Sequence, residues 1–252
     1  MRFGLSFLAW LVIIRMEPKT GFPIFASTSP ARTTFLQGLL TTVELSALCI
    51  VLSVLVGIAG AGLQLSRLRI VRRAVALYVA FFRNTPPLAQ LYFFYFGIGS
   101  LMTLVPDGTG GTRPLFDNFT WAAVSMSLFA GAFNVEIFRA GVEAVPRPTL
   151  EAAEALGYSP VGAYLHVVLP LAFRIRLPAL NNNLVTLVKG TTVAYAIGVP
   201  ELMTASSTIW GASVNIPEMM VVLLVTFLAI VAGLVFVLHR VEHALRIPGY
   251  TR

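Results

Sequence analysis

The sequence EAAEALGYSPVGAYLHVVLP occupies residues 151–170, an amphipathic and small-residue-rich stretch between long apolar segments. Thr149 and Glu151 suit the start of a helix, because an N-cap oxygen and a negative charge both favour free backbone N–H groups. Gly157 is expected to close this first helix, since glycine adopts the left-handed conformation that ends many helices.

A second helix is predicted directly after the first. Ser159 followed by Pro160 matches an N-cap and a first helical position. Pro170 is expected to end this helix, because proline lacks an N–H group and restricts the residue before it. The stretch therefore predicts two short helices joined by an elbow at the membrane surface, suited to docking another protein. An interfacial amphipathic helix without a partner is the alternative.

The composition of the whole chain indicates an integral membrane protein. Of 252 residues, 57% are hydrophobic and 12% are charged, whereas soluble domains carry about 25% charged residues. The net charge of +7 need not indicate nucleic acid, because cytoplasmic loops of membrane proteins collect Lys and Arg. The one cysteine, Cys49, lies inside an apolar run and is expected to be buried.

Several apolar segments approach the roughly 20 residues that a spanning helix needs. The second is broken by Pro86-Pro87, and small faces at Gly57, Gly60 and Gly62 in the first favour close helix packing. A polar loop is expected at 106–117 and a short re-entrant or surface helix at 201–217. The predicted spans are approximately 35–65, 74–105, 118–141, 177–200 and 218–239.

The N-terminal segment does not fit this pattern. Residues 1–16 contain a 12-residue apolar run bounded by Arg2 and Arg15, and no small-residue cleavage site follows. We interpret it as a helix lying at the membrane surface, or as the product of a start codon misplaced upstream of Met16; a sixth span is the remaining alternative. Residues 1–33 thus form an interfacial segment and lead-in, and 34–252 form one transmembrane domain.

Lys and Arg residues are distributed unevenly between the predicted spans. Five lie on one side of the membrane, three of them before residue 20. Because cytoplasmic loops are enriched in basic residues, the richer side is predicted to be cytoplasmic, together with the stretch at 151–170 and the C-terminus. That side holds eleven: Arg67, Arg69, Arg72, Arg73, Arg139, Arg147, Arg174, Arg176, Arg240, Arg246 and Arg252.

No catalytic or metal site is predicted. The sequence lacks the G-x-x-x-x-G-K-[ST] loop that cradles ATP phosphates. Its three His residues and one Cys are scattered, without the spacing of metal ligands.

Polar groups at membrane depth are the remaining functional candidates, because they are costly there. Arg83, Glu136 and Lys189 are candidates for a substrate pathway, with Asn182 and Thr186 on the same predicted span as Lys189. Alternatively, these groups pair with one another and stabilise the bundle. The run Asn181–Asn183 can also form hydrogen bonds between helices.

The spacing within 151–170 also resembles a known motif. Glu151-Ala152-Ala153, Gly157 and Leu169-Pro170 match the EAA loop of bacterial ABC-importer permeases, with Val167 in place of the usual isoleucine. FFRNTPPLAQLYFFYFGI and VEIFRAGVEAVP resemble the polar amino acid (His/Glu/Gln/Arg/opine) subfamily, and the likeness covers about 34–252. The sequence departs from that subfamily at Asn84, where a glycine is usual, and at Gly190, where an acid is usual.

This resemblance implies an all-α permease core of five transmembrane helices, of the type I importer kind, in the bacterial cytoplasmic membrane. Residues 147–170 would be the cytoplasmic coupling loop, with Glu151, Ala152, Ala153, Gly157, Leu169 and Pro170 as its coupling residues. The implied partners are a cytoplasmic ATPase dimer, a second identical or paralogous permease, membrane lipid, and a periplasmic or extracellular binding protein for a polar amino acid or related solute. ATP and Mg would be bound by the ATPase, with no cofactor in this chain and no nucleic acid partner.

Two other functions remain open on the sequence alone. An ion-driven secondary transporter of a small polar solute would favour two halves with matching broken helices, and no internal repeat is evident. A membrane anchor or assembly subunit would have no pathway at all.

Overall fold

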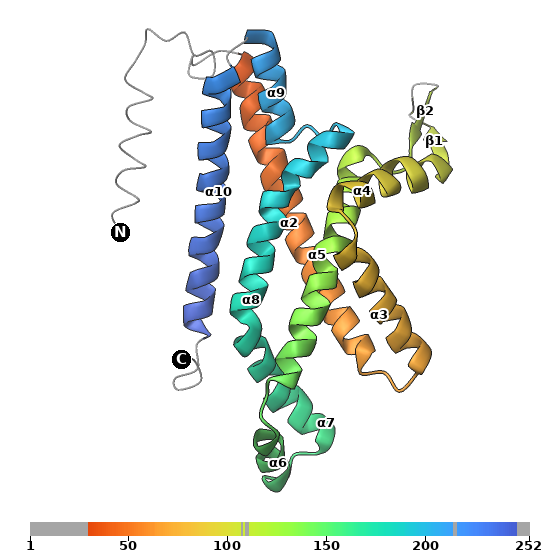
Figure 1. Cartoon of the computed structure of the whole chain (residues 1–252), viewed down its shortest axis with the longest axis vertical. Helices are drawn as coiled ribbons and strands as arrows, with labels where there is room; N and C mark the ends of the chain where they lie inside the picture. The colour runs from red at the N-terminus through yellow and green to blue at the C-terminus, as the bar shows by residue number, and fades with distance from the viewer. Residues whose placement is uncertain (1–29, 107, 109–110, 214–215, 246–252) are drawn as a thin grey trace.

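The computed structural model describes residues 30–106, 108, 111–213 and 216–245 and is almost entirely helical (Figure 1). The predicted interfacial helix at 1–16 lies outside these residues. The elements are α2 (Pro30–Gln64), α3 (Arg69–Asn84), α4 (Pro87–Tyr92), the π-helical turn η1 (Phe93–Ile98), η2 (Gly99–Leu101), β1 (Leu104–Pro106), β2 (Thr112–Pro114), α5 (Asn118–Glu143), α6 (Arg147–Ala155), α7 (Pro160–Ala163), the π-helical turn η3 (Tyr164–Val168), α8 (Leu169–Gly190), η4 (Thr191–Ile197), α9 (Leu202–Ser213) and α10 (Ile216–Ala244).

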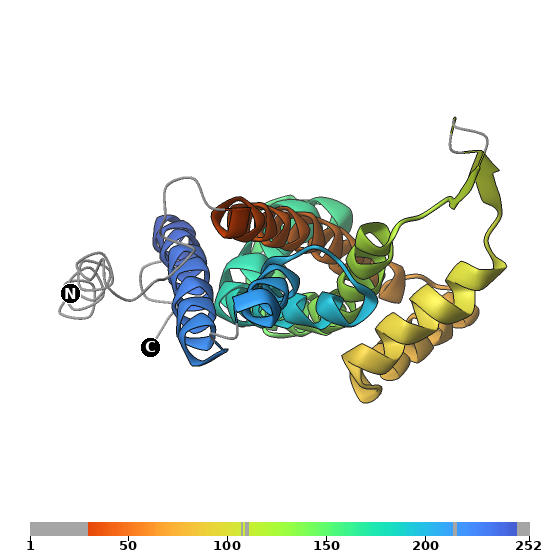
Figure 2. The same cartoon turned by 90° about the horizontal axis from the view of Figure 1, so that it is seen from above.

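Helix α5 is the centre of the bundle. α2 packs along its length, and α8 and α3 pack on its other faces. In the apolar stretch of α5, 61% of the residues are buried, against 6% in the corresponding stretch of α10. α10 stands at the edge of the bundle (Figures 1 and 2). An exposed helix that is apolar all round is stable in lipid but not in water. The bundle is therefore built for a membrane.

Glycines allow α2 and α5 to approach closely. A Cβ atom at Gly57 would lie 2.4 Å from Asn134 Cβ, and one at Gly60 would lie 2.4 Å from Val135 Cγ2. Only glycine fits at such a contact, as in other helix pairs in membranes. The prediction for Gly62 is wrong, because nothing lies within 4 Å of its Cβ position; it points away from α5.

Four helical segments of the described chain are long and apolar enough to cross a membrane: α2, α5, Pro160–Ile197 and α10. The predicted second span is divided at Thr85-Pro86, next to the break predicted at Pro86-Pro87. It consists of α3 and the α4–η1 segment, which diverge at that point (Figure 1). α3 buries Val75, Val79 and Phe82 on one face, and its two valines pack with Val135 of α5. Gln90 holds the break by donating from Nε2 to the carbonyl oxygens of Phe82 and Thr85, both at 3.0 Å.

The predicted end of a helix at Pro170 is wrong. The chain continues as one helical segment from Pro160 to Ile197, so the fourth span begins well before residue 177. The physical reason is the π-helical turn η3, in which the Leu169 N–H group donates to Tyr164 O, five residues back. This register shift lets Pro170 sit in the first turn of α8, where no N–H group is required.

The start of α6 also differs from the prediction. The helix begins at Arg147 after Pro146, which has an extended conformation, and Thr149 lies inside it. Pro148 occupies the first turn and presets its φ angle. The polar loop predicted at 106–117 overlaps a small antiparallel hairpin, which begins two residues earlier at Leu104 and pairs Val105 with Arg113.

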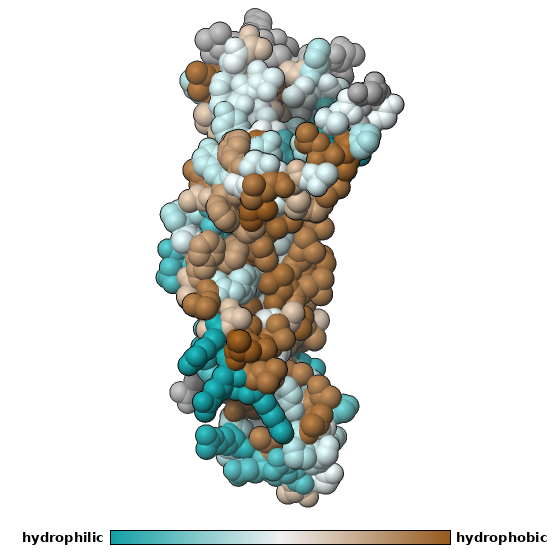
Figure 3. All heavy atoms as spheres, turned by 90° about the vertical axis from the view of Figure 1, so that its right-hand side faces the viewer, coloured by the Kyte–Doolittle hydropathy of each residue, from teal (hydrophilic) through white to brown (hydrophobic). Residues whose placement is uncertain are grey.

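The two ends of the bundle differ in polarity. The α2–α3 turn, the α6–α7 segment and the C-terminal end of α10 lie at one end, and the hairpin and α9 lie at the other (Figure 1). Figure 3 shows a broad hydrophobic surface over the middle of the molecule, with strongly hydrophilic side chains gathered below it. The basic segments that the sequence assigned to one side of the membrane therefore share one end of the fold.

Candidate functional site: a helical elbow and an arginine-lined pocket

The elbow between α6 and α7 is set by backbone hydrogen bonds. Gly157 has a φ angle of +90°, as predicted from its identity. Its N–H group donates to Glu154 O at 2.9 Å, and the Tyr158 N–H group donates to Ala153 O at 3.2 Å. This pair of bonds is a Schellman motif, which satisfies the free carbonyl groups at the end of α6.

The second arm of the elbow begins as the sequence predicted. Ser159 Oγ accepts a hydrogen bond from the Gly162 N–H group at 3.1 Å, and Pro160 is the first residue of α7. Backbone groups are therefore hydrogen-bonded both at the end of α6 and at the start of α7, and these local bonds fix the angle of the elbow.

The elbow and the turn that follows it expose apolar side chains. Leu156 is 81% exposed, Val161 68% and Leu165 52%. Ala153 is buried in the elbow, whereas the other predicted coupling residues are exposed: Glu151, Ala152, Gly157, Leu169 and Pro170. Exposed apolar side chains on a rigid, partly polar projection are typical of a protein-docking surface.

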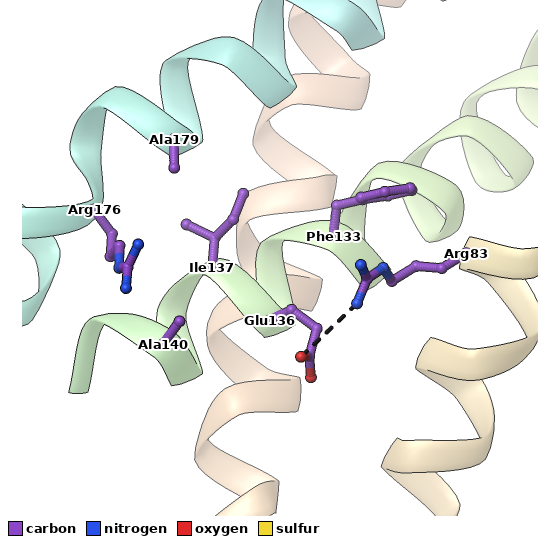
Figure 4. A pocket seen from close by; sticks show the side chains of 7 residues that line it. All are labelled: Arg83, Phe133, Glu136, Ile137, Ala140, Arg176 and Ala179. Carbon is purple, nitrogen blue, oxygen red and sulfur yellow. Dashed lines mark ion pairs between the residues drawn. The ribbon is translucent and has the colours of Figure 1, made fainter. Parts of the chain in front are cut away.

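A pocket of about 240 Å³ lies between α3, α5 and α8 (Figure 4). Its lining residues are Arg83, Phe133, Glu136, Ile137, Ala140, Arg176 and Ala179.

Glu136 is the electrostatic centre of this pocket. Arg139 donates to both of its carboxylate oxygens, with Nε–Oε1 at 3.3 Å and Nη2–Oε2 at 2.9 Å. Arg83 points toward Glu136, with Nη1–Oε2 at 3.8 Å, and lies over the ring of Phe133 with Cζ 5.2 Å from its centroid. Both pathway candidates, Arg83 and Glu136, are therefore brought together, and they also pair with each other.

Arg176 is a lining residue that the sequence did not single out. Its Nε atom is buried and lacks a hydrogen-bond partner among the described residues. The pocket thus presents guanidinium groups from α3 and α8, and its own carboxylate, Glu136, pairs with Arg83 and Arg139. Guanidinium groups of this kind can bind a carboxylate by charge-assisted hydrogen bonds. No feature of the sequence marked Arg176 as a pocket residue, because it was expected in a loop before the fourth span.

The other pathway candidates lie outside the pocket. Asn182, Thr186 and Lys189 are exposed and share one face of α8, at helical spacings of four and three residues. Ala179, which lines the pocket, continues the same face one turn earlier. The pocket and this polar stripe are therefore neighbouring parts of one surface of α8.

The asparagine run joins α8 to its neighbours. Asn181 Nδ2 donates to Glu242 Oε2 of α10 at 3.0 Å, and Asn183 Nδ2 donates to Asn134 Oδ1 of α5 at 2.8 Å. Hydrogen bonds between helices were predicted for this run and are confirmed for these two residues. Asn182, between them, is left on the exposed face.

Glu201 is a buried carboxylate that the sequence did not identify as special. It is 0% exposed and accepts from the N–H groups of Met203 at 2.8 Å and Thr204 at 2.9 Å. It therefore caps the start of α9. Within the described residues, no group of three or more metal-ligating side chains is present.

The geometry defines a multi-span helical membrane protein with an exposed helical elbow at one end. The family described as binding-protein-dependent transport system inner membrane component matches residues 50–247. The chain belongs to this family. It is a transport subunit of the membrane, and the match decides against a self-contained ion-driven transporter.

Individual relatives agree with this family. The chain is 30% identical over 223 residues to the arginine transport system permease protein ArtQ of Bacillus subtilis, covering 88% of this chain and 97% of that one. It is 28% identical over 205 residues to the probable amino-acid ABC transporter permease protein PatM of Vibrio harveyi, covering 80% and 85%.

Solved structures share the fold. The crystal structure of an amino acid ABC transporter with histidines matches with a TM-score of 0.74 at 25% identity, covering 84% of this chain and 94% of that chain. An inward-facing structure of the MetNI methionine ABC transporter matches with a TM-score of 0.66 at 20% identity, covering 87% and 100%. The predicted type I importer permease fold is confirmed.

Proposed function

We propose that this chain is the permease subunit of an ATP-driven importer for a polar amino acid or an amino-acid-derived solute. Its α6–α7 elbow docks on a separate cytoplasmic ATPase dimer, which binds ATP and Mg. A second permease copy or paralogue completes the pathway, and a soluble binding protein delivers solute from the outer side. The amino-acid class is supported by the names of relatives such as ArtQ and PatM.

The exposed apolar surface of the elbow carries this proposal. Leu156 and Val161 project from a segment whose angle is held by the Schellman motif at Gly157 and the cap at Ser159. A rigid elbow can transmit a displacement of the ATPase to the spans, because α7 continues through η3 into α8 without a break. The C-terminal end of α10, at the same end of the bundle as the elbow, then faces the cytoplasm.

The substrate pathway is proposed along the surface of α8 that carries Lys189, Thr186 and Asn182 and ends at the pocket with Arg83 and Glu136. These side chains offer a cation, hydrogen-bonding groups and a carboxylate to a zwitterionic solute. Arg139 neutralises part of the Glu136 charge, so the pocket keeps a positive balance with Arg83 and Arg176.

The docking role is tested by Gly157→Val. Valine is strained at a φ angle of +90°, although space for a Cβ atom is available. The variant is expected to insert normally but to lose ATPase association and solute-stimulated ATP hydrolysis by at least about tenfold, because a strain of roughly 1–3 kcal/mol favours a reorganised elbow. Co-purification of the ATPase and hydrolysis in proteoliposomes measure both effects.

Gly157→Asn is the matched control, because asparagine tolerates positive φ angles better than other non-glycine residues. It is expected to retain most of the association. Wild-type ATPase coupling in Gly157→Val would contradict the docking role, and uptake driven by an ion gradient without any ATPase would favour the alternative transporter.

A further inference from the structure

The turn between α2 and α3 carries a dense cluster of positive charge. Four exposed arginines fall within seven residues, and the sequence from 45 to 106 contains no Asp or Glu. We call residues 65–73 the basic turn. Its arginines are Arg67, Arg69, Arg72 and Arg73.

The charge of the basic turn is not balanced within the described chain. None of its four arginines forms an ion pair there. Arg72 donates from Nη1 to the Ser66 carbonyl oxygen at 2.8 Å, which fixes its position without neutralising it. The acids Glu136 and Glu143 on α5 are already paired with Arg139. Mutual repulsion of the four guanidinium groups, and their position near the positive end of α3, therefore call for external anions.

Large apolar side chains alternate with these arginines. Leu65 is 59% exposed, Leu68 63% and Ile70 76%. The turn also lies at the basic end of the bundle, next to the edge of the hydrophobic surface (Figures 1 and 3). Arginines beside exposed leucines suit the boundary of a bilayer, where guanidinium groups reach headgroup phosphates and leucines reach the acyl chains.

We propose that the basic turn is a binding site for the headgroups of anionic phospholipids. The negative phosphate supplies the missing counter-charge, and the apolar side chains select a lipid over a soluble anion. The elbow formed by α6 and α7 projects beyond this turn (Figure 1), so lipid binding at the turn and protein docking at the elbow use separate surfaces.

The test measures lipid selectivity of the purified full-length permease. Apparent affinities for phosphatidylglycerol and phosphatidylcholine are determined by native mass spectrometry for wild type and for Arg69→Gln/Arg73→Gln. The wild type is expected to prefer phosphatidylglycerol. In the variant, the affinity ratio of phosphatidylglycerol to phosphatidylcholine is expected to fall roughly fivefold for each arginine replaced. Raising the ionic strength is expected to reduce the wild-type preference, because exposed charges are screened.

Two control variants separate charge at this turn from charge in general. Arg69→Lys/Arg73→Lys keeps the charge and is expected to keep most of the selectivity. Arg174→Gln/Arg240→Gln removes two exposed arginines elsewhere at the same end and is expected to leave it unchanged. An equal loss in this pair, or unchanged selectivity in Arg69→Gln/Arg73→Gln, would overturn the proposal.

Two further measurements distinguish other anions. Inorganic phosphate at millimolar concentration is expected not to displace phosphatidylglycerol; full displacement would assign the turn to a soluble phosphate and overturn the lipid proposal. Loss of ATPase co-purification in Arg69→Gln/Arg73→Gln, with lipid selectivity intact, would assign the turn to a protein partner instead.

Discussion

Single atoms determine how closely the two central helices approach. Gly57 faces Asn134, which is fully buried, and the carbonyl carbon of Asn134 would lie 3.2 Å from an added Cβ atom. A backbone atom inside a helix cannot yield as the end of a flexible side chain can. The packing of α2 on α5 therefore depends on the absence of a methyl group at this position.

Gly57→Ala is expected to destabilise the fold by about 1–3 kcal/mol, the usual cost of overpacking a core. Thermal unfolding of the purified protein in detergent measures this change. Gly62→Ala is the matched control on the same helix, because nothing lies within 4 Å of its Cβ position. It is expected to be neutral or to stabilise the helix by about 0.5–1 kcal/mol. Equal effects of the two substitutions would contradict the close contact.

At the scale of elements, α9 is held to α2 by a buried hydrogen bond between residues that are far apart in sequence. Thr42 Oγ1 accepts from the Leu202 N–H group at 2.9 Å and donates to Gly38 O at 2.9 Å. Glu201 caps the adjacent first turn of α9, next to the position of Gly38. The short helix predicted at 201–217 is thus fixed on the bundle by polar groups.

Thr42→Val preserves the shape of the side chain but removes the acceptor for Leu202. It is expected to cost about 1–3 kcal/mol, because a buried N–H group loses its partner. Thr42→Ser keeps the oxygen and is expected to cost less. Thr41→Val provides a control, since the Thr41 hydroxyl donates only within α2, to Gln37 O. Unfolding midpoints that are the same for Thr42→Val and Thr41→Val would show that the contact is unimportant.

At the scale of the whole molecule, the basic segments lie at one end of an apolar bundle, and the hairpin and α9 lie at the other end (Figure 1). The hairpin containing Arg113 and the elbow containing Leu156 mark these ends (Figure 1). Because basic segments are retained in the cytoplasm, the elbow is expected to face inward and the hairpin outward.

Cysteine labelling measures this orientation. Cys49, the one cysteine of the chain, is 0% exposed, so an introduced thiol is the accessible one. A membrane-impermeant maleimide on intact cells is expected to label Leu115→Cys and not Leu156→Cys, and the pattern is expected to reverse in inverted vesicles. Labelling of Leu156→Cys from outside intact cells would place the elbow on the wrong side for an ATPase.

Local chemistry determined much of this protein from sequence alone. The apolar segments were recognisable because lipid requires long uninterrupted hydrophobic helices. The elbow was recognisable because Gly157 permits a positive φ angle and Ser159-Pro160 starts a helix. Its coupling role remains a prediction, as do the substrate-pathway roles.

Only the tertiary structure decided how these helices are rotated and which polar groups meet. It placed Arg83 beside Glu136, buried Glu201 against α2, and turned Gly62 away from α5. It also carried the helix through Pro170 by means of the η3 turn. The physical reason is that backbone preferences depend on neighbouring residues, whereas partners across helices depend on the register and rotation that packing of the whole bundle selects.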